Sequence, residues 1–549
     1  MKKWKILSTV TAKSVEVVFE ELLKNRGINK KNLKSFLEPS LENVTLELVG
    51  LSKKDFEKFE KRIDQANKAK EKIIIYGDYD VDGICASAIL WETLYSKSKN
   101  VFPYIPDRAE EGYGLSIKGI DNVLINYPDT KVVITVDNGI VAYDAIDYAN
   151  KLGLEIIITD HHQMGSKKNN ASIILHTTNL CGAGIAWVLA RELKFESKEK
   201  IREKVELAML ATIADLVPLV GANRAIVKVG LEILKNTKRV GLQEILREAK
   251  IEKGKIGVYT VGHIISPRLN ATGRIDKAVN SLRLLCTKDI NKARELASSI
   301  SLINRNRQDL TEDSVAHAKM LHISNSYSER ITIVSHKSYN AGVIGIVASQ
   351  MVETYYKPAF AISIGEEISK GSARSIKGVN IIELLRSVSD HLIDVGGHPM
   401  AAGFSVHTKK LEEFFKALSL KAEKIVTDEI LERYITIDLL LPLRLISKKL
   451  YQEISKLEPF GMGNPEPVFA TEDVLVSEIR KIGRDSNHLK MKLENGGKTF
   501  DAVGFGLANM YDIDHGDQIS IAYTIDENEW QGKKSLQLKI RDIKPERLN

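Results

Sequence analysis

The chain has 549 residues, of which 43% are hydrophobic, so we expect several folded domains, at roughly 150 residues each, and not a disordered chain. Its 79 basic and 72 acidic side chains give a formal charge of +7, which is compatible with a polyanionic partner without identifying one. Three widely spaced cysteines argue against a disulfide framework and a zinc–thiolate site. The basic N-terminus lacks the apolar run of a signal peptide, and no stretch approaches a membrane-spanning length, which predicts a soluble, cytoplasmic protein.

Residues 1–70 are strongly charged and are predicted to form a mostly helical N-terminal region. From residue 71 to residue 235, short apolar runs alternate with helical stretches. The apolar runs cover 73–76, 132–136 and 156–159, and the helical stretches cover 84–95 and 142–152. This alternation predicts βαβ units and a parallel sheet that is covered on both faces. Ligands bind at the carboxyl ends of the strands in such sheets, and here acidic residues follow each apolar run.

Three further regions follow the predicted sheet. Residues 236–325 are typical of a helical connector, and residues 326–415 again combine strands and helices. Residues 425–549 alternate apolar and polar side chains in several short segments, and Asn495-Gly496-Gly497 is typical of a hairpin turn. We therefore predict an α/β multidomain protein that ends in a small β-barrel of the OB-fold type.

The loop GDYDVDG, residues 77–83, carries Asp78, Asp80 and Asp82 on one side of an extended backbone. Three carboxylates so close together repel one another unless cations or protons neutralise them. With an imidazole, such oxygens suit Mn²⁺ or Mg²⁺, and two such ions can clamp a phosphate and generate hydroxide at neutral pH. An EF-hand is disfavoured because its twelfth position is Ile89 and not Glu, and a P-loop lacks its Gly-Lys-Ser/Thr. For this loop alone, a merely solvated acidic turn stays the alternative.

The next two predicted strands end in the same kind of residues, at Asp137 and at Asp160-His161-His162. A lone histidine is more often structural than a ligand, but two adjacent histidines beside an aspartate are less often so. Neighbouring residues at a strand end point to opposite sides, so we expect one of the two imidazoles to face a metal. We assign His161 to the metal and His162 to the substrate phosphate or a supporting role, with Asp160 orienting an imidazole.

Four motifs resemble, in order, those of the DHH phosphoesterase superfamily. They are GDYDVDG (77–83), TVDNG (135–139), TDHH (159–162) and ADLVPL (214–219). The resemblance implies a site for two ions, Mn²⁺ or Mg²⁺, with Asp137 as the bridge. Its ligands would be Asp80, Asp82, Asp137, His161 and Asp215, and catalytic roles would go to His162, Asp78 and Asp160. Many relatives have a histidine where this chain has Tyr76, so we expect one ion to be held differently, with help from Asp78.

Further motifs are similar in order to those of the RecJ family, which comprises bacterial exonucleases that degrade single strands from 5′ to 3′ in DNA repair and recombination. They are PRLNATGR (267–274), GVIGIVAS (342–349), KGSARS (370–375), GGHPMAAG (396–403) and LEPFGMGNPEPVF (457–469). The resemblance runs from about residue 70 to beyond residue 540. It implies a DHH domain, a connecting helical region, a DHH-associated domain and an OB-fold.

The resemblance and the chemistry of the side chains together predict a set of contacts to phosphate and DNA. The set is Arg108, Arg268, Asn270, Arg274, Ser372, Arg374 and His398. Guanidinium groups match phosphate oxygens, and the small residues around His398 permit close approach of a ligand. The structural alternatives are a solvated surface side chain for Arg108 and, for GGHPMAAG, a tight turn into a closely packed helix. Gln350 stands where the family commonly carries Arg, which predicts weaker recognition of a 5′-phosphate.

The function that this resemblance implies is a single-stranded-DNA-specific 5′ to 3′ exonuclease that releases 5′-mononucleotides by two-metal hydrolysis. One alternative is a DHH phosphodiesterase or phosphatase acting on oligoribonucleotides or small nucleotides, but such relatives are generally shorter and lack the terminal barrel. The other is a non-catalytic, DNA-binding DHH scaffold, which the intact acidic residues disfavour. The family commonly cooperates with a helicase and a single-strand-binding protein. We expect a monomer that does not associate with membranes.

Overall fold

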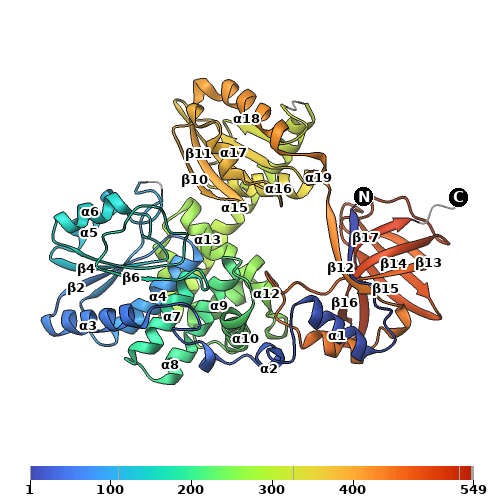
Figure 1. Cartoon of the computed structure of the whole chain (residues 1–549), viewed down its shortest axis with the longest axis horizontal. Helices are drawn as coiled ribbons and strands as arrows, with labels where there is room; N and C mark the ends of the chain where they lie inside the picture. Colours follow the sequence, from blue (N-terminus) through green and yellow to red (C-terminus); the bar gives the residue numbers. More distant parts are fainter. Residues whose placement is uncertain (1, 109, 325–326, 531, 546–549) are drawn as a thin grey trace. The chain divides into compact units, whose positions relative to one another are not determined.

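The computed structural model describes residues 2–108, 110–324, 327–530 and 532–545 (Figure 1). It separates into two compact units. Unit 1 comprises Met1–Leu269, Ala278–Arg294 and Tyr434–Asn549, and unit 2 comprises Asn270–Lys277 and Glu295–Arg433. Within the described residues, no helix is both long and apolar enough to cross a membrane.

A parallel sheet of five strands forms the first α/β domain of unit 1. Its strands are β2 (Lys72–Tyr76), β3 (Val101–Tyr104), β4 (Thr130–Val136), β5 (Glu155–Asp160) and β6 (Ile173–His176). The order across the sheet is β3-β2-β4-β5-β6, and every neighbouring pair is parallel. The prediction of a parallel sheet is therefore confirmed, and the carboxyl ends of β2, β4 and β5 lie side by side at one edge.

Helices cover both faces of this sheet, as its nearly continuous apolar strands require. The helices are α4 (Val81–Tyr95), α5 (Ile117–Asn126), α6 (Tyr143–Lys151) and α7 (Gly182–Leu193). On one face, α5 and α6 bury a core that includes Ile74, Val133 and Ile158, whereas α4 and α7 pack together on the other (Figure 1). Helix α3 (Lys53–Ala69) lies against β6.

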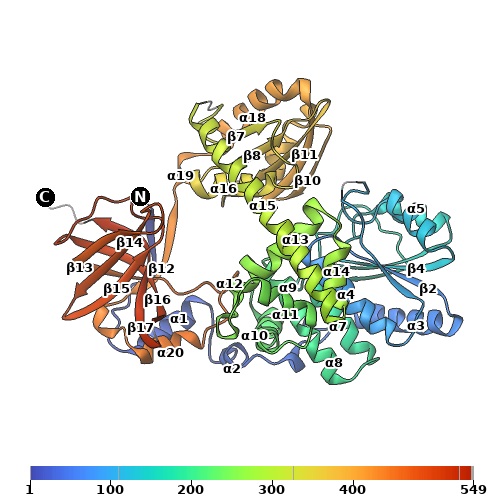
Figure 2. The same cartoon turned by 180° about the vertical axis from the view of Figure 1, so that it is seen from behind.

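A series of helices follows this sheet along the chain, and the boundary between the two units falls within two of them. It comprises α8 (Lys198–Glu203), α9 (Val205–Ala214), α10 (Gly221–Lys235), α11 (Val240–Glu248), α12 (Val258–Thr260), α13 (Ser266–Ile275), α14 (Val279–Cys286) and α15 (Ile290–Ser324). Helix α9 is buried on all sides and packs against α4, α7 and α10. Helix α14 packs against α4 and α11 (Figure 2). The predicted helical connector, residues 236–325, covers α11 to α15 of this series, and its helix α14 packs against α4.

Unit 2 contains a second sheet of five strands. They are β7 (Thr332–His336), β8 (Ala359–Ser363), β9 (Ile368–Arg374), β10 (Asp394–His398) and β11 (Ala401–His407). The order is β10-β11-β9-β8-β7, and only the β7–β8 pair is parallel. Its helices are α16 (Ile344–Tyr355), α17 (Ile381–Arg386), α18 (Leu411–Ile425) and α19 (Asp428–Leu431).

The segment GGHPMAAG corrects one expectation. It is not a turn into a packed helix but a β-hairpin, in which His398 of β10 pairs with Ala401 of β11. At Gly397 the backbone has a φ of +142°, and a Cβ atom there would lie 2.4 Å from the carbonyl oxygen of Ala401. The glycine is therefore required by the close approach of the two strands. Small residues that suggested helix packing instead serve strand pairing.

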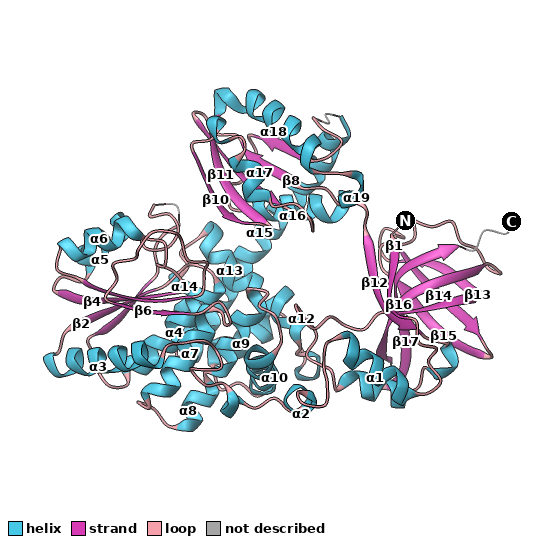
Figure 3. Ribbon diagram, viewed as in Figure 1, coloured by secondary structure: helices cyan, strands magenta, loops and turns pink. Residues whose placement is uncertain are grey.

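The C-terminal part of unit 1 is a β-barrel (Figure 3). Its five strands are β13 (Phe469–Ile482), β14 (His488–Asn495), β15 (Lys498–Gly504), β16 (Gln518–Trp530) and β17 (Lys533–Pro545). Strand β12 (Tyr434–Leu440) pairs with β13 at the edge of the barrel, and helix α20 (Lys448–Ser455) precedes β13. The order β13-β14-β15-β17-β16 is closed by pairing of β13 with β16. This five-stranded barrel confirms the predicted OB-fold. The predicted hairpin is present too, because Asn495 pairs with Lys498 across Gly496 and Gly497.

The N-terminal residues contain helices, as expected, and also a strand that the sequence analysis did not predict. Besides α1 (Val15–Asn25), α2 (Leu33–Leu37) and α3, they contain β1 (Lys3–Ser8), which pairs in parallel with β12. The indole of Trp4 donates a hydrogen bond of 2.7 Å to Asp542 of β17. Helix α1 packs against α20 and buries Val18 and Leu22 in the core of the barrel. A six-residue strand whose partner lies near the other end of the chain leaves little periodic signal in the sequence.

Replacing Trp4 with Phe tests this attachment. We expect the variant to lower the free energy of unfolding of the barrel by about 2 kcal/mol, because the buried carboxylate of Asp542 loses a donor. Lys5→Ala, an exposed position on the same strand, is the matched control and should change stability by less than about 0.5 kcal/mol. Urea unfolding measures both, and equal stability of the two variants would contradict the pairing of β1 with the barrel.

Candidate metal centre

The structure brings the predicted metal ligands together at the carboxyl edge of the parallel sheet. Asp78, Asp80 and Asp82 follow β2, Asp137 follows β4, and His161 follows β5. Because β2, β4 and β5 are neighbours, these side chains converge. The last predicted ligand comes from elsewhere: Asp215 directly follows α9.

The converging side chains form three overlapping groups, in each of which one ligand atom per residue lies within 4.8 Å of the others. The groups are Asp82, His161 and Asp215; Asp78, Asp80 and Asp137; and Asp137, His161 and His162. The His161 Nε2 atom lies 3.1 Å from an oxygen of Asp137, 3.6 Å from Asp82 and 3.7 Å from Asp215. Asp137 therefore lies between the first two groups, which is where a bridging carboxylate would be.

Backbone amides hold the acidic loop in place. Asp80 is the N-cap of α4, and its carboxylate accepts hydrogen bonds from the amides of Asp82 at 2.9 Å and Gly83 at 3.1 Å. A Cβ atom on Gly83 would lie only 2.5 Å from the nitrogen of Asp78. The glycine lets the helix begin directly against the loop, so that Asp78 and Asp80 approach each other.

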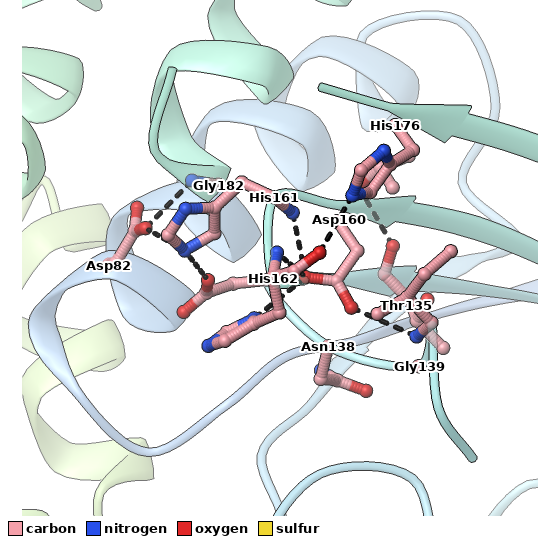
Figure 4. Close-up of polar contacts among 12 residues, drawn as sticks. Asp82, Thr135, Asn138, Gly139, Asp160, His161, His162, His176 and Gly182 are labelled. Atoms are coloured by element: carbon pink, nitrogen blue, oxygen red, sulfur yellow. Dashed lines mark hydrogen bonds and ion pairs between the residues drawn. The ribbon is translucent and has the colours of Figure 1, made fainter. Parts of the chain in front are cut away.

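The N-terminus of α7 holds a second carboxylate, that of Asp82, and the sequence analysis did not identify this contact. The amides of Gly182 and Ala183 donate to the two oxygens of Asp82 at 2.7 and 2.6 Å (Figure 4). Asp137 has a left-handed backbone, with a φ of +63°, and a Cβ atom on Gly182 would lie 2.6 Å from its Cβ.

Burial and mutual repulsion make this cluster a strong candidate for cations. Burial, followed by the charges of neighbouring carboxylates, raises the pKa values of Asp78, Asp80 and Asp137, and it raises the pKa of Asp215 to about 8. Among the described residues, both oxygens of Asp78 are buried without a hydrogen-bond partner. Oxygen ligands with an imidazole are the set that suits Mn²⁺ or Mg²⁺. The residues present therefore fit two such ions.

His162 is held by hydrogen bonds at both ring nitrogens. Its Nδ1 atom lies 2.8 Å from Asp160 and its Nε2 atom 3.0 Å from the hydroxyl of Tyr113. Burial alone would lower the pKa of His162, but the hydrogen bond to Asp160 and the charge of Asp160 raise it to about 8. Asp160 also accepts the amides of His161, His162 and Ile140, at 2.7, 3.1 and 2.9 Å (Figure 4). Asp160 thus orients an imidazole as the sequence suggested, whereas Tyr113 left no motif that pointed to this role.

Tyr76, which stands where relatives have a histidine, turns its side chain into the core. Its ring stacks on Tyr104 at a centroid distance of 5.2 Å, and its hydroxyl donates to the carbonyl of Gly114 at 3.3 Å. In its neighbourhood, Asp78 and Asp80 supply the oxygens that lie close to Asp137. This arrangement fits the expectation that Asp78 helps to hold one ion.

The predicted phosphate contacts are divided between the two units. Arg108 and Arg268 belong to unit 1, and Asn270, Arg274, Ser372, Arg374 and His398 belong to unit 2. The exposed guanidinium of Arg108 lies 5.2 Å from the ring centre of Tyr79, and Arg268 donates to the carbonyl of Ile264 at 2.7 Å. His398 is exposed on the β10–β11 hairpin.

Within unit 2, the segments GVIGIVAS and KGSARS meet. Arg374 donates to the hydroxyl of Ser372 at 3.1 Å, and a Cβ atom on Gly345 would lie 3.0 Å from the Arg374 guanidinium. Arg274 donates to the carbonyl of Gly342 at 3.1 Å. Burial lowers the pKa of Arg374 below its ordinary value. Two arginines, a hydroxyl and the beginning of α16 therefore lie close together, a combination that favours anions. Gln350, one turn further along α16, is exposed and donates to Glu353.

Comparison with known families identifies the class of the protein. The description "DHH family, N-terminal domain" matches residues 72–216, "DHHA1 domain" matches residues 323–424, and "RecJ OB domain" matches residues 437–542. The parallel sheet with its carboxylate–imidazole cluster is thus that of a DHH phosphoesterase.

The relatives narrow the assignment. The RecJ protein of Bacillus subtilis is 37% identical over 493 residues, which cover 88% of this chain and 62% of the length of that protein. The RecJ protein of Salmonella typhimurium is 30% identical over a region that covers 86% of this chain and 87% of the length of that protein. The crystal structure of Thermus thermophilus RecJ with Mn²⁺ matches 100% of this chain and 80% of its own, with a TM-score of 0.83 and 28% identity. The same protein with Mg²⁺ gives a TM-score of 0.77 at 27% identity, over 99% of this chain and 79% of its own. This chain belongs to the RecJ family.

Replacing Asp137 with Asn tests the metal centre through thermal stability, without measuring enzymatic activity. Asn tolerates the left-handed backbone, and it removes one of the repelling charges. We expect the metal-free variant to melt higher than the unmodified protein, and to lose the gain of about 2.7 kcal/mol that Mn²⁺ at about 100 times its Kd would give. Asp129→Asn is the matched control, since Asp129 is exposed and has a φ of +65°. Calorimetric melting with and without Mn²⁺ measures this gain in stability. If Asp137→Asn gains as much stability from Mn²⁺ as the unmodified protein does, the assignment is contradicted.

Proposed function

We propose that this chain is a single-stranded-DNA-specific exonuclease that works from 5′ to 3′ and releases 5′-mononucleotides in DNA repair and recombination. The observation that supports it most directly is the pair of cation-binding groups that meet at Asp137. The relatives from Bacillus subtilis and Salmonella typhimurium carry the name of single-stranded-DNA-specific exonucleases. A scaffold without activity would not need all of these carboxylates, and a phosphatase of small nucleotides would not need the terminal barrel.

The candidate ligands of the centre form two groups, one for each cation. Asp82, His161 and Asp215 would hold one cation, and Asp78, Asp80 and Asp137 the other. Bound Mn²⁺ or Mg²⁺ supplies Lewis acidity toward a phosphate oxygen and lowers the pKa of a water molecule.

His162 has a separate task in this proposal. Asp160 fixes its ring through Nδ1, and the Nε2 atom faces the hydroxyl of Tyr113. Because Asp160 holds Nδ1, the Nε2 atom is the one left to donate a hydrogen bond to the scissile phosphate. Asp160 would then act as a positioning residue through His162.

The DNA contacts follow from the chemistry of the remaining residues. Arg274, Ser372 and Arg374 would bind a phosphate at the beginning of α16. Arg108 would contact the strand near its 5′ end, and Arg268, Asn270 and His398 would contribute further contacts to phosphate. The neutral side chain of Gln350 predicts a weak preference for a 5′-phosphate over a 5′-hydroxyl.

We further propose that the protein acts in the cytoplasm as a monomer, on single strands that a helicase exposes and a single-strand-binding protein covers. This part of the proposal rests on the family alone. Sedimentation of the full chain with and without a single strand tests the monomer.

Degradation of single strands labelled at one end or the other tests the proposal. With Mn²⁺, a 5′-label should appear first as a mononucleotide, while a 3′-label should pass through progressively shorter strands. Asp137→Asn should lower the rate by about 10³-fold or more, because a catalytic cation contributes several kcal/mol. Asp129→Asn should leave the rate unchanged.

Three outcomes would contradict the proposal. Shortening from the 3′ end would reverse the polarity, and absence of degradation would favour a binding scaffold. Cleavage of short oligoribonucleotides in preference to DNA would favour a DHH phosphodiesterase of small substrates. The degradation rates of strands with 5′-phosphate and 5′-hydroxyl ends, measured in parallel, test the weak preference for a 5′-phosphate that Gln350 predicts.

A further inference from the structure

Asp215 differs from the other predicted ligands in how its backbone is held. It lies outside the sheet, in the six-residue connection 215–220 between α9 and α10. Its amide donates to the carbonyl of Ala211 at 2.9 Å, and Leu216, the next residue, is left-handed with a φ of +55°. The side chain of Asp215 is 38% exposed, whereas those of Asp82 and Asp137 are almost fully buried. The position of its carboxylate therefore depends on the shape of this connection.

The connection is contacted by a segment from the far end of the chain. The amide of Leu219 donates a hydrogen bond of 2.7 Å to the carbonyl oxygen of Met462. Met462 lies in a tight turn, residues 461–464, in which Gly461 and Asn464 exchange two backbone hydrogen bonds of 2.9 and 3.1 Å. This turn belongs to the motif LEPFGMGNPEPVF, which leads into the barrel.

The two glycines of this turn are pressed against the connection. A Cβ atom on Gly463 would lie 2.9 Å from the Cβ of Pro218, and a Cβ atom on Gly461 would lie 2.7 Å from a methyl group of Leu219. Gly463 also has a left-handed backbone with a φ of +73°. The turn therefore fits against residues 218–219 without space for an added methyl group.

Buried polar side chains fix the turn. The amide of Asn464, which is 1% exposed, donates to the carbonyls of Leu457 and Pro459 at 2.8 and 2.9 Å, and its oxygen accepts from Arg26 at 3.1 Å.

A second buried side chain ties the connection's own helix to the same segment. Arg224 of α10 is fully buried, and its guanidinium donates to the carbonyls of Phe36 at 2.7 Å and Glu458 at 2.6 Å. The guanidinium also stacks on the ring of Phe36 at 3.9 Å. A planar guanidinium that satisfies two carbonyls at once holds these segments in one arrangement.

We infer that the turn 461–464 is a positioning element for Asp215, so that the segment leading into the barrel helps to complete one of the two cation sites. The inference rests on the proposed role of Asp215 as a metal ligand. The turn fixes Pro218 and Leu219, these fix the connection, and the connection fixes the carboxylate. The group Asp78, Asp80 and Asp137 has no part in this chain of contacts. Disturbing the turn should therefore weaken one cation site and spare the other.

Gly463→Ala is the test, with Mn²⁺ titrated into the full chain and followed by calorimetry and by the electron paramagnetic resonance of free Mn²⁺. We expect the affinity for one of two ions to fall by about tenfold or more, as happens when groups that orient a ligand are lost. Gly506→Ala, in the barrel itself, is the matched control, because Gly506 has a φ of +72° and no atom within 4 Å of an added Cβ. It carries the same backbone cost without the contact, and it should bind both ions as the unmodified protein does.

Asp215→Asn separates the inference from the metal-centre assignment. If Asp215→Asn and Gly463→Ala both lower the affinity for the same ion, the inference holds. If Asp215→Asn lowers the affinity for one ion while Gly463→Ala binds both ions as Gly506→Ala does, the turn is not a positioning element. If Asp215→Asn changes the affinity for neither ion, the proposed role of Asp215 itself is wrong. Should Gly463→Ala fail to fold, Gly461→Ala takes its place with the same outcomes, since the atoms nearest to its methyl group belong to the side chains of Leu219 and Val258 and not to the backbone.

Discussion

The central constraint on the structure is that carboxylates converge at one edge of a parallel sheet, where they repel one another. Asp78, Asp82 and Asp137 are almost fully buried, and burial together with their neighbours' charges raises the pKa values of Asp78 and Asp137. Such an arrangement is costly in a folded protein unless cations compensate for it. The fold therefore maintains a negative centre whose natural complement is a pair of divalent ions.

The surrounding backbone makes this concentration of charge possible. Amides at the beginnings of α4 and α7 donate to Asp80 and Asp82, where helix N-termini favour negative charge. Gly83 and Gly182 allow those helices to begin in contact with the carboxylates. Asp137 adopts a left-handed backbone that few side chains accept. The glycines, the caps and the strained residue are consequences of one requirement, which is to hold oxygens together that repel one another.

The sequence was sufficient for the parts of the molecule in which local pattern and chemistry coincide. Buried strands are continuous apolar runs, and the acidic residues that follow them reveal the edge of the sheet. It was insufficient where structure depends on distant segments. Trp4 lies in a strand whose partner is near the other end of the chain, and GGHPMAAG has small residues that suit a helix contact as well as a hairpin. Tyr113 and Gly182 contribute a hydroxyl and an amide, which no motif distinguishes from any other.

The barrel has two connections to the rest of unit 1 that sequence order alone would not suggest. Strand β1 extends its sheet, and the turn 461–464 contacts the residues that follow Asp215. The segment that leads into the barrel is thereby in direct contact with the connection that carries Asp215.

The most direct test of the account is the anomalous scattering of Mn²⁺ in crystals of the full chain. The account predicts two peaks per chain, roughly 3.5–4 Å apart, on either side of the Asp137 carboxylate. One peak should have Asp82, His161 and Asp215 around it, and the other Asp78 and Asp80. A single peak, or peaks away from Asp137, would contradict the central claim that the carboxylate cluster is a two-cation centre.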